Sequence, residues 1–301
     1  MADVHGILLL DKPLHLSSAG AVARMKYLFR ARKVGHTGSL DPLASGMLPI
    51  CFGEATKFGS LLLDADKTYR VTVRLGERTP TADRESEVVE RRELPPFTAA
   101  HLTRALEAFP REYLQTPPMH SALKQEGKPL YEYARAGVTR ERAPRPIVIR
   151  ELSLLSWSAP EVCFDVRCTK GAYIRVLAED LATRMGTIGH LAALRRLSVT
   201  PFDGQAVWTL AELEALASDK LASLLLPVDA ALKACGRLDV DLAQSAALRQ
   251  GRSVSLPAGE ASKPGTVRIY AADGGFLGLG ELGAGSRLRP LRLISAHANL
   301  A

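Results

Sequence analysis

Two segments of the chain alternate apolar and polar residues, and this pattern restricts the possible folds most strongly. In "TYRVTVRLG" (68–76), the odd-numbered residues from Tyr69 to Leu75 fall on one face, as in a strand with one buried side. "VCFDVRC" (162–168) alternates in the same way. Helical patterns lie around these segments without the regular strand–helix repeat of a doubly wound fold. The sequence therefore predicts an α+β fold with a mainly antiparallel, mixed sheet.

Four helices are expected from capping residues and from apolar residues spaced three and four apart. In the first helix, Val22, Met25 and Phe29 share one face. The last begins with a capping box, in which Thr209 is followed three residues later by Glu212. The expected starts are Ser17 or Ser18, Thr98, the residues after Gly171, and Thr209.

The pattern of apolar residues and glycines in the sequence changes after "LLLPVDAAL" (224–232). From about residue 236, short strand-like runs such as "TVRIYAA" and "FLGLGEL" alternate with glycine-rich turns. This predicts a small β-barrel over 236–301, which follows a larger domain over 1–235. Within the larger domain, residues 116–149 are rich in Pro, Gly, Lys and Arg, which predicts a surface insertion.

Lysine and arginine outnumber aspartate and glutamate by 39 to 32, which gives a formal net charge of +7. A positive field favours polyanionic partners, since cationic side chains release counterions from phosphates. The basic runs 24–33, 124–150 and 195–196 are the segments expected to meet phosphates. A solvated charge run is the alternative explanation of each.

Several classes of protein do not fit the composition. No run approaches the roughly 20 apolar residues of a membrane-spanning helix. The N-terminal residues lack the basic region and apolar core of a secretory signal, so we expect a cytoplasmic protein without membrane contact. The four cysteines form no CxxC pair and are expected to be reduced thiols. The histidines lack ligand spacing, so we expect no metal and no organic cofactor.

"KVGHTGSLDPLASGMLP" (33–49) concentrates glycine and proline around one histidine and one aspartate. Glycine permits backbone conformations that other residues resist, and Pro42 restricts Asp41 to an extended conformation. A loop of this kind holds one carboxylate in a fixed, exposed position. On the residues alone, a simple turn in which Asp41 bonds neighbouring amides is the alternative. The glycine patterns of phosphate-binding loops, GxxxxGK[ST] and GxGxxG, are absent from this loop.

The string "GHTGSLDPLASGMLP" closely resembles the active-site motif of the TruB family, bacterial tRNA pseudouridine synthases that modify uridine 55 in the TΨC arm. Further segments match in the family's order. They are "GILLLDKP" (6–13), "GEATKF" (53–58), "KTYRVTVRLGERTPTAD" (67–83), "PPMHSALKQEGKPLYEYARAG" (117–137), "CTKGAYIRVLAEDL" (168–181) and "LRRLSVTPF" (194–202). The resemblance covers essentially residues 6–210. Less distinctly, the tail resembles a PUA RNA-binding domain.

The resemblance implies a pseudouridine synthase catalytic domain with a small PUA-like β-barrel. It implies that Asp41 is the catalytic nucleophile, that Tyr69 lies against the target base, and that Arg175 pairs with the aspartate. It further implies that His36 packs among the bases of the remodelled arm. The substrate-binding positions that it implies are His36, Tyr173, Leu194, Lys12 and Asp83. Of these, we expect the lysine, with the proline after it, to shape the pocket rather than to act in the chemistry.

The implied chemistry breaks the C1′–N1 bond of uridine, rotates the uracil and forms a C1′–C5 bond without redox change. A carboxylate suffices as nucleophile or as stabiliser of an oxocarbenium-like species, and an arginine partner favours its ionised form. The ring of Tyr69 offers a stacking face to the extruded base, worth about 1–3 kcal/mol. Its phenol is a weaker candidate for moving the C5 proton. Taken singly, Tyr69 fits a half-buried strand aromatic and Arg175 a solvated helix charge.

The sequence departs from the family pattern at two places. His15 stands where the family often has glycine, and Pro80 and Ser86 stand where aspartate and glycine are common. These departures concern the turn after Lys12 and the loop around Asp83. They leave Asp41, Tyr69 and Arg175 untouched.

The family reading implies a stand-alone, monomeric isomerase whose partner is the TΨC stem-loop of tRNA, with no obligate protein partner. One alternative is an RNA-binding protein or tRNA-folding chaperone on the same scaffold. A second is a guide-RNA-dependent synthase in a multiprotein particle, against which the segment 117–137 and the short tail argue. A third is a nucleosidase or glycoside hydrolase, but Asp41 has no second acid in its loop.

Overall fold

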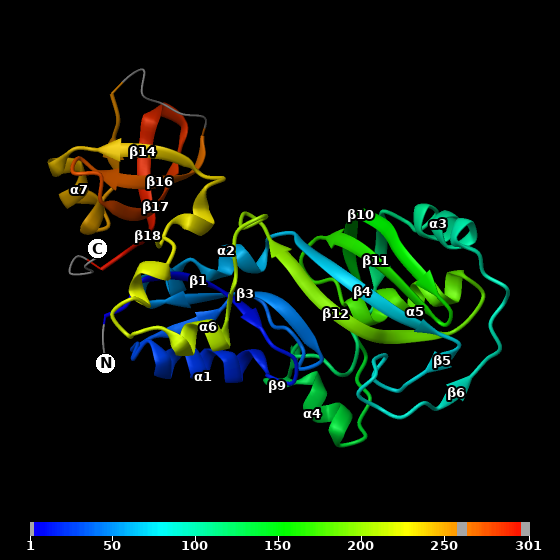
Figure 1. The fold of residues 1–301 in the computed structure, drawn as a ribbon. Coiled ribbons are helices and arrows are strands. Elements are labelled where there is room, and N and C mark those ends of the chain that lie inside the picture. The colour runs from blue at the N-terminus through cyan, green and yellow to red at the C-terminus, as the bar shows by residue number, and fades with distance from the viewer. Residues whose placement is uncertain (1–2, 258–263, 296–301) are drawn as a thin grey trace. The chain divides into compact units, whose positions relative to one another are not determined.

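The structure, a computed structural model, describes residues 3–257 and 264–295 (Figure 1). The chain divides into two compact units. The first unit comprises Met1–Asp41, Met47–Leu63 and Pro201–Ala301, and the second comprises Pro42–Gly46 and Asp64–Thr200.

The second unit is built on an antiparallel sheet, to which the beginning of one further strand adds a parallel pairing. The antiparallel strands, in spatial order, are β12 (Gly189–Val199), β4 (Lys67–Leu75), β11 (Glu161–Cys168), β10 (Arg145–Ser158) and β7 (Glu112–Gln115). The first residues of β3 (Ala44–Phe52) pair in parallel with β12, so that Ala44 lies opposite Leu194. Smaller elements of this unit are β5 (Glu77–Arg78), β6 (Glu90–Arg91), β8 (Lys124–Gln125), β9 (Lys128–Pro129), α3 (Ala99–Glu107), α4 (Leu130–Arg135) and α5 (Ile174–Arg184).

The core of the second unit follows the alternation read from the sequence. Tyr69, Val71, Val73 and Leu75 of β4 are all buried, whereas the residues between them are half-buried or exposed. Helix α5 packs on β12, and its Leu177 is fully buried. The predicted α+β class with a mixed, mainly antiparallel sheet is therefore confirmed.

The first unit contains β1 (Gly6–Lys12), β2 (Val34–His36), the rest of β3 and β13 (Trp208–Thr209). Strand β13 pairs in parallel with β1, and β2 pairs antiparallel with β3. The helices before the C-terminal region are α1 (Ser18–Leu28), α2 (Gly59–Leu63) and α6 (Leu210–Ala215), with the 3₁₀ turns η1 (Gly53–Lys57), η2 (Ala222–Leu224) and η3 (Ala230–Leu232).

The C-terminal part of this unit is a curled five-stranded sheet over the described residues (Figure 1). Its core includes Leu238, Leu248, Ile269 and Leu288. The alternation of strands with glycine-rich turns predicted the strands, but it missed the helix that covers them. The elements are β14 (Gly236–Val240), α7 (Leu242–Arg249), β15 (Val254–Ser255), β16 (Gly265–Ala271), β17 (Phe276–Leu282), η4 (Ala284–Ser286) and β18 (Arg287–Leu293).

Aromatic and polar contacts attach this curled sheet to the rest of the first unit. The ring of Phe58, beside α2, meets Phe276 of β17 with their centroids 5.6 Å apart. The Tyr270 hydroxyl donates a hydrogen bond to Asp229, which Arg268 also contacts at 3.3 Å. Residues 258–263, within the expected barrel, and 296–301, at its end, lie outside the described residues.

The predicted helix caps agree with the structure at three positions. Ser17 caps α1, Thr98 caps α3, and Thr209 with Glu212 forms the capping box of α6. The segment 116–149 differs from the expectation at its end, since 145–149 already form the start of β10. Ile147 and Ile149 are buried there because they face the sheet's core, so the insertion is shorter than predicted.

The division into domains 1–235 and 236–301 remains a prediction. Strand β14 begins at Gly236, at the expected boundary. The compact units are nevertheless grouped differently, because 201–301 forms one unit with the N-terminal segments of the chain.

Gly46 is the tightest point of the second unit, and replacing it tests the β3–β12 pairing. Its φ is +104°, and a Cβ there would lie 2.2 Å from the Arg196 carbonyl oxygen. We expect Gly46→Ala to lower the free energy of unfolding by about 3 kcal/mol or more, through backbone strain and overpacking. Gly35→Ala is the matched control, because no atom lies within 4 Å of the added methyl group. Urea denaturation of both variants checks this, and equal stability would contradict the proposed close approach.

Candidate functional site

Asp41 lies in the loop that joins β2 to β3 in the first unit. The two strands form an antiparallel pair in which His36 lies opposite Ile50. The Thr37 N–H donates to the Pro49 carbonyl at 3.2 Å, which extends this pairing into the loop. Both His36 and Asp41 are half-buried, so each side chain keeps an accessible surface.

A buried serine fixes the peptide just before Asp41. The Ser18 hydroxyl donates to the Leu40 carbonyl at 3.0 Å and accepts the Leu40 N–H at 2.7 Å. One hydroxyl does both because it carries one hydrogen and two lone pairs. The sequence left open whether Ser17 or Ser18 capped α1. Ser17 is the cap, and Ser18 holds the candidate catalytic loop.

Lys12 is fully buried at the end of β1. Its Nζ donates to the carbonyls of Pro13 at 2.8 Å and Leu16 at 2.7 Å, so it braces the turn that leads into α1. In that turn His15 has a φ of +64°, a conformation that favours glycine. The burial of Lys12 fits the expectation that it shapes the site, and it argues against a direct contact with RNA.

Arg175 lies in the first turn of α5 in the second unit, and its side chain is buried. Its Nη2 donates to the His120 carbonyl at 2.7 Å and its Nη1 to the Thr81 carbonyl at 3.3 Å. The Nη1 atom also lies 3.6 Å from the carboxylate of Asp83. The structure thus brings two of the sequence-predicted residues, Arg175 and Asp83, into one ion pair.

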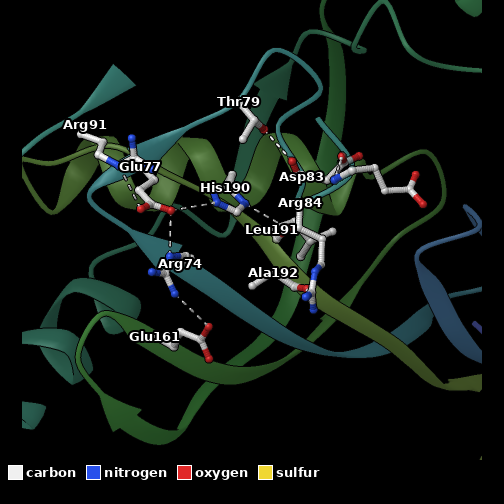
Figure 2. Close-up of polar contacts among 11 residues, drawn as sticks. Arg74, Glu77, Thr79, Asp83, Arg84, Arg91, Glu161, His190, Leu191 and Ala192 are labelled. Carbon is white, nitrogen blue, oxygen red and sulfur yellow. Dashed lines mark hydrogen bonds and ion pairs between the residues drawn. The ribbon is translucent and has the colours of Figure 1, made fainter. Parts of the chain in front are cut away.

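The carboxylate of Asp83 is itself held by its own loop. It accepts hydrogen bonds from the Thr81 hydroxyl at 2.6 Å and from the Glu85 N–H at 3.0 Å. The Thr79 hydroxyl binds the Asp83 carbonyl at 2.6 Å, and Figure 2 shows this loop beside Leu191 of β12. Because the Asp83 side chain is only 4% exposed, it acts on Arg175 rather than on a ligand in solvent.

Below this loop, a cluster of charged residues ties β4, β5 and β12 together (Figure 2). Glu77 accepts a hydrogen bond from Arg74 at 2.8 Å and lies 3.9 Å from Nε2 of the buried His190. Desolvation alone raises the pKa of Glu77, but the hydrogen bonds from Arg74 and Arg91 hold that pKa below its usual value. A carboxylate of this kind stays charged and fixes the strands that carry the Asp83 loop.

Tyr69 and Leu194 lie on neighbouring strands and share one face of the sheet. The register pairs Tyr69 with Arg196 and Val71 with Leu194 without a bulge between them. Both Tyr69 and Leu194 are buried. Tyr173, half-buried, is the residue that precedes the first turn of α5.

Two buried cations, Arg196 and Lys67, lie on β12 and β4. The sequence prediction was wrong for Arg196. The run 195–196 was expected to meet phosphates, but Arg196 is 1% exposed and only Arg195 is exposed. The alternation of β12 turns Arg196 inward beside Tyr69. Lys67 of β4 is also buried, and desolvation followed by the charge of Arg196 lowers its pKa to about 8. The spacing of two residues between Lys67 and Tyr69 was the signal that both face the core.

Comparisons with known proteins agree on one family. The family model described as "TruB family pseudouridylate synthase (N terminal domain)" matches residues 26–174. Models for the "tRNA pseudouridylate synthase B C-terminal domain" and for "Pseudouridine synthase II TruB, C-terminal" match 175–233 and 237–294. A tRNA pseudouridine synthase B from Sodalis glossinidius is 47% identical, over 97% of this chain and 96% of the relative. The chain belongs to the TruB family.

Two more comparisons extend this assignment. The tRNA pseudouridine synthase B of Haemophilus influenzae (strain PittEE) is 48% identical over 98% of this chain and 97% of the relative. The crystal structure of a Cbf5-Nop10-Gar1 complex includes a chain that matches with a TM-score of 0.72 and 23% identity, over 97% of this chain and 84% of that chain. At that identity the structural match shows the shared fold alone.

The described parts of this TruB chain contain no group of three or more His, Cys, Asp or Glu side chains arranged to hold a metal ion. All four cysteines are free thiols in the structure. Among its described helices, none has the length and apolar character needed to cross a membrane.

Replacing Ser18 tests whether it fixes the Asp41 loop. Ser18→Ala leaves the buried N–H and carbonyl of Leu40 without this hydroxyl, which we expect to cost about 1–3 kcal/mol of stability. The Leu40 amide should then exchange its hydrogen faster, as measured by hydrogen–deuterium exchange. Ser17→Ala is the control: it removes the cap bond to the Gly20 N–H, worth about 1 kcal/mol, and leaves Leu40 protected. Unchanged protection of Leu40 in Ser18→Ala would refute this role.

The buried ammonium of Lys67 predicts a pH-dependent stability. Its pKa is about 8 in the folded chain, against an ordinary value of 10.5, so between these values the unfolded chain binds more protons. The free energy of unfolding should therefore rise with pH across this window, by up to about 1.4 kcal/mol per pH unit relative to Lys67→Met. Both proteins also carry Cys168→Ala, because the charge of Lys67 shifts the pKa of that thiol. Urea denaturation at pH 8 and pH 10 then isolates the lysine. Parallel pH profiles would contradict the buried charge.

Proposed function

We propose that this protein isomerises uridine 55 to pseudouridine in the TΨC arm of tRNA, with Asp41 as the catalytic nucleophile. The observation that carries the proposal is the family membership over the full chain, with relatives 47% and 48% identical that are tRNA pseudouridine synthases B. The loop of Asp41 supports it, because Ser18 fixes that loop and Asp41 is only half-buried.

In the proposed reaction, the carboxylate of Asp41 attacks C1′ or stabilises an oxocarbenium-like species as the C1′–N1 bond breaks. The uracil rotates and C5 bonds to C1′. The proton on C5 passes to solvent and N1 gains a proton, so the product is an isomer of the substrate. The step needs no redox partner and no phosphate energy.

The other residues have supporting roles in this proposal. Tyr69 stacks against the extruded base, and stacking of this kind is worth about 1–3 kcal/mol. Arg175 pairs with the catalytic carboxylate, while Asp83 keeps its guanidinium in place. His36 packs among the bases of the opened arm, and Tyr173 and Leu194 contact substrate in the same pocket. Lys12 is assigned to bracing the pocket, since it is fully buried.

The proposed partner is the TΨC stem-loop, bound without an obligate protein partner by a cytoplasmic monomer that needs no cofactor. The net charge of +7 supports a polyanionic substrate. Lys124 and Lys128, in the hairpin of the insertion, are exposed and available to phosphates. The C-terminal domain, 236–301, is proposed as a PUA-like module that adds affinity for RNA.

The direct test is tritium release from a tRNA transcript labelled at uracil C5, with no added metal or cofactor. The wild type should release about one equivalent from uridine 55. Asp41→Asn should release none, because an amide is neither a nucleophile nor a counter-charge of comparable strength. Both proteins should bind the tRNA with similar dissociation constants. Asp219→Asn, at an exposed aspartate, is the matched control and should react like the wild type.

Two outcomes would overturn the proposal in different ways. Good binding without release by the wild type would favour the RNA chaperone or a guide-dependent enzyme without its partners. Full release by Asp41→Asn would keep the isomerase activity but remove the nucleophile from Asp41.

A further inference from the structure

Gln115 is a buried polar residue for which the reaction outlined above has no role. It is the last residue of β7, immediately before the insertion, and it is 2% exposed. Burying a primary amide is costly unless its hydrogen bonds are made inside the protein. Its partners therefore indicate what the residue is for.

The side chain of Gln115 holds both backbone groups of one residue, Tyr173. Its Oε1 accepts the Tyr173 N–H at 2.7 Å, and its Nε2 donates to the Tyr173 carbonyl at 3.1 Å. The second Nε2 hydrogen goes to the Tyr113 hydroxyl at 2.9 Å. Both amide hydrogens are thus used, and the orientation of the amide is fixed.

Tyr113 lies on the same strand as Gln115 and supports its amide. The Tyr113 oxygen accepts the Nε2 hydrogen of Gln115 at 2.9 Å. Desolvation and then the negative charge of Asp180, on α5, raise the pKa of Tyr113 above its usual value, so its hydroxyl stays neutral. Strand β7 therefore holds the residue before the first turn of α5 through the Gln115 amide.

These hydrogen bonds of Gln115 matter because the start of α5 carries two candidate site residues, Tyr173 and Arg175. Tyr173 precedes the helix, and its own side chain makes no capping hydrogen bond. Arg175 follows two residues later and must reach the carbonyls of Thr81 and His120 from that start. A shift of the Tyr173 peptide would move the guanidinium, and a displacement of about 1 Å at a catalytic group can cost on the order of 100-fold in rate.

We propose that Gln115 is a positioning residue of the isomerase: it fixes the Tyr173 peptide so that Arg175 and the Tyr173 ring are presented in the geometry that the reaction needs. This inference rests on the proposed function. It assigns to Gln115 an effect on the chemical step and no contact with RNA.

The principal variant is Gln115→Met, which keeps much of the side-chain volume and removes all three hydrogen bonds. At saturating tRNA, its single-turnover rate of tritium release should fall about tenfold or more. Its dissociation constant for tRNA should stay within about twofold of the wild type. Gln205→Met is the matched control: it makes the same substitution at a half-buried glutamine that has no role in the proposed site. This control should react at the wild-type rate.

Two milder variants keep the test valid if Gln115→Met folds poorly. Gln115→Glu keeps an oxygen for the Tyr173 N–H but replaces the donor that faces the Tyr173 carbonyl, so it should also slow the reaction. Tyr113→Phe leaves both contacts with Tyr173 and removes only the support of the amide, so a smaller loss of about two- to threefold is expected. Thermal unfolding of each variant identifies any loss of fold.

A double variant separates positioning from a general structural role. If Gln115 acts through Arg175, adding Gln115→Met to Arg175→Lys should slow the reaction less than twofold further. If Gln115 merely stabilises the fold, the two losses should multiply, and that result would overturn the proposal. Wild-type rates in Gln115→Met and Gln115→Glu would overturn it as well, with the proposed function intact. A wild type that releases no tritium would overturn the proposed function, and this inference with it.

Discussion

The second unit depends on the burial of one charge, the guanidinium of Arg175. Its side chain is 7% exposed, and a buried charge is tolerated only when it is paired and its hydrogen bonds are made. These partners come from two segments distant in sequence: Asp83 and the Thr81 carbonyl lie on one loop, and the His120 carbonyl lies on the insertion. Strand β12 must hold the first loop, and the start of α5 must aim the side chain. The geometry of this half of the candidate site is thus a condition for burying one cation.

The same device fixes the backbone near two of the charged candidate residues, Asp41 and Arg175. Ser18 binds the N–H and the carbonyl of Leu40, next to Asp41, and Gln115 binds both groups of Tyr173, near Arg175. In each case a buried side chain from another element takes the place of a sheet or helix partner that a loop peptide lacks. Loops are mobile by default, whereas catalysis requires side chains held to within about 0.5 Å. The side chains of Ser18 and Gln115 therefore hold the loop residues Leu40 and Tyr173 in place as backbone hydrogen bonds hold residues of helices and strands.

Local patterns predicted those parts of the fold whose causes are local. The alternation around Tyr69 and the capping box of Thr209 with Glu212 depend on residues two or three apart, and the structure confirms both. The hydrogen bonds of Ser18 and Gln115 could not be predicted, because Ser18 and Leu40 are 22 residues apart in sequence and Gln115 and Tyr173 are 58 apart. Charge was misleading at Arg196, since its position on β12 turns it inward against the usual preference of arginine for solvent. The family resemblance supplied the candidate residues; the burial of Lys12 fits its expected role in shaping the pocket, whereas the burial of Asp83 directs its carboxylate to Arg175.

The departures from the family pattern fall on the backbone of the site. At His15 the chain adopts the left-handed conformation that suits the family's glycine, and the side chain is exposed, so the cost is backbone strain alone. Ser86 adds an interaction: the Thr81 N–H donates to its oxygen at 3.2 Å, and the two hydroxyls lie 2.6 Å apart. Because the Thr81 hydroxyl gives its proton to Asp83, the Ser86 hydroxyl must donate to Thr81. Where glycine would leave this loop freer, the serine thus lengthens the hydrogen-bond chain that ends on the partner of Arg175.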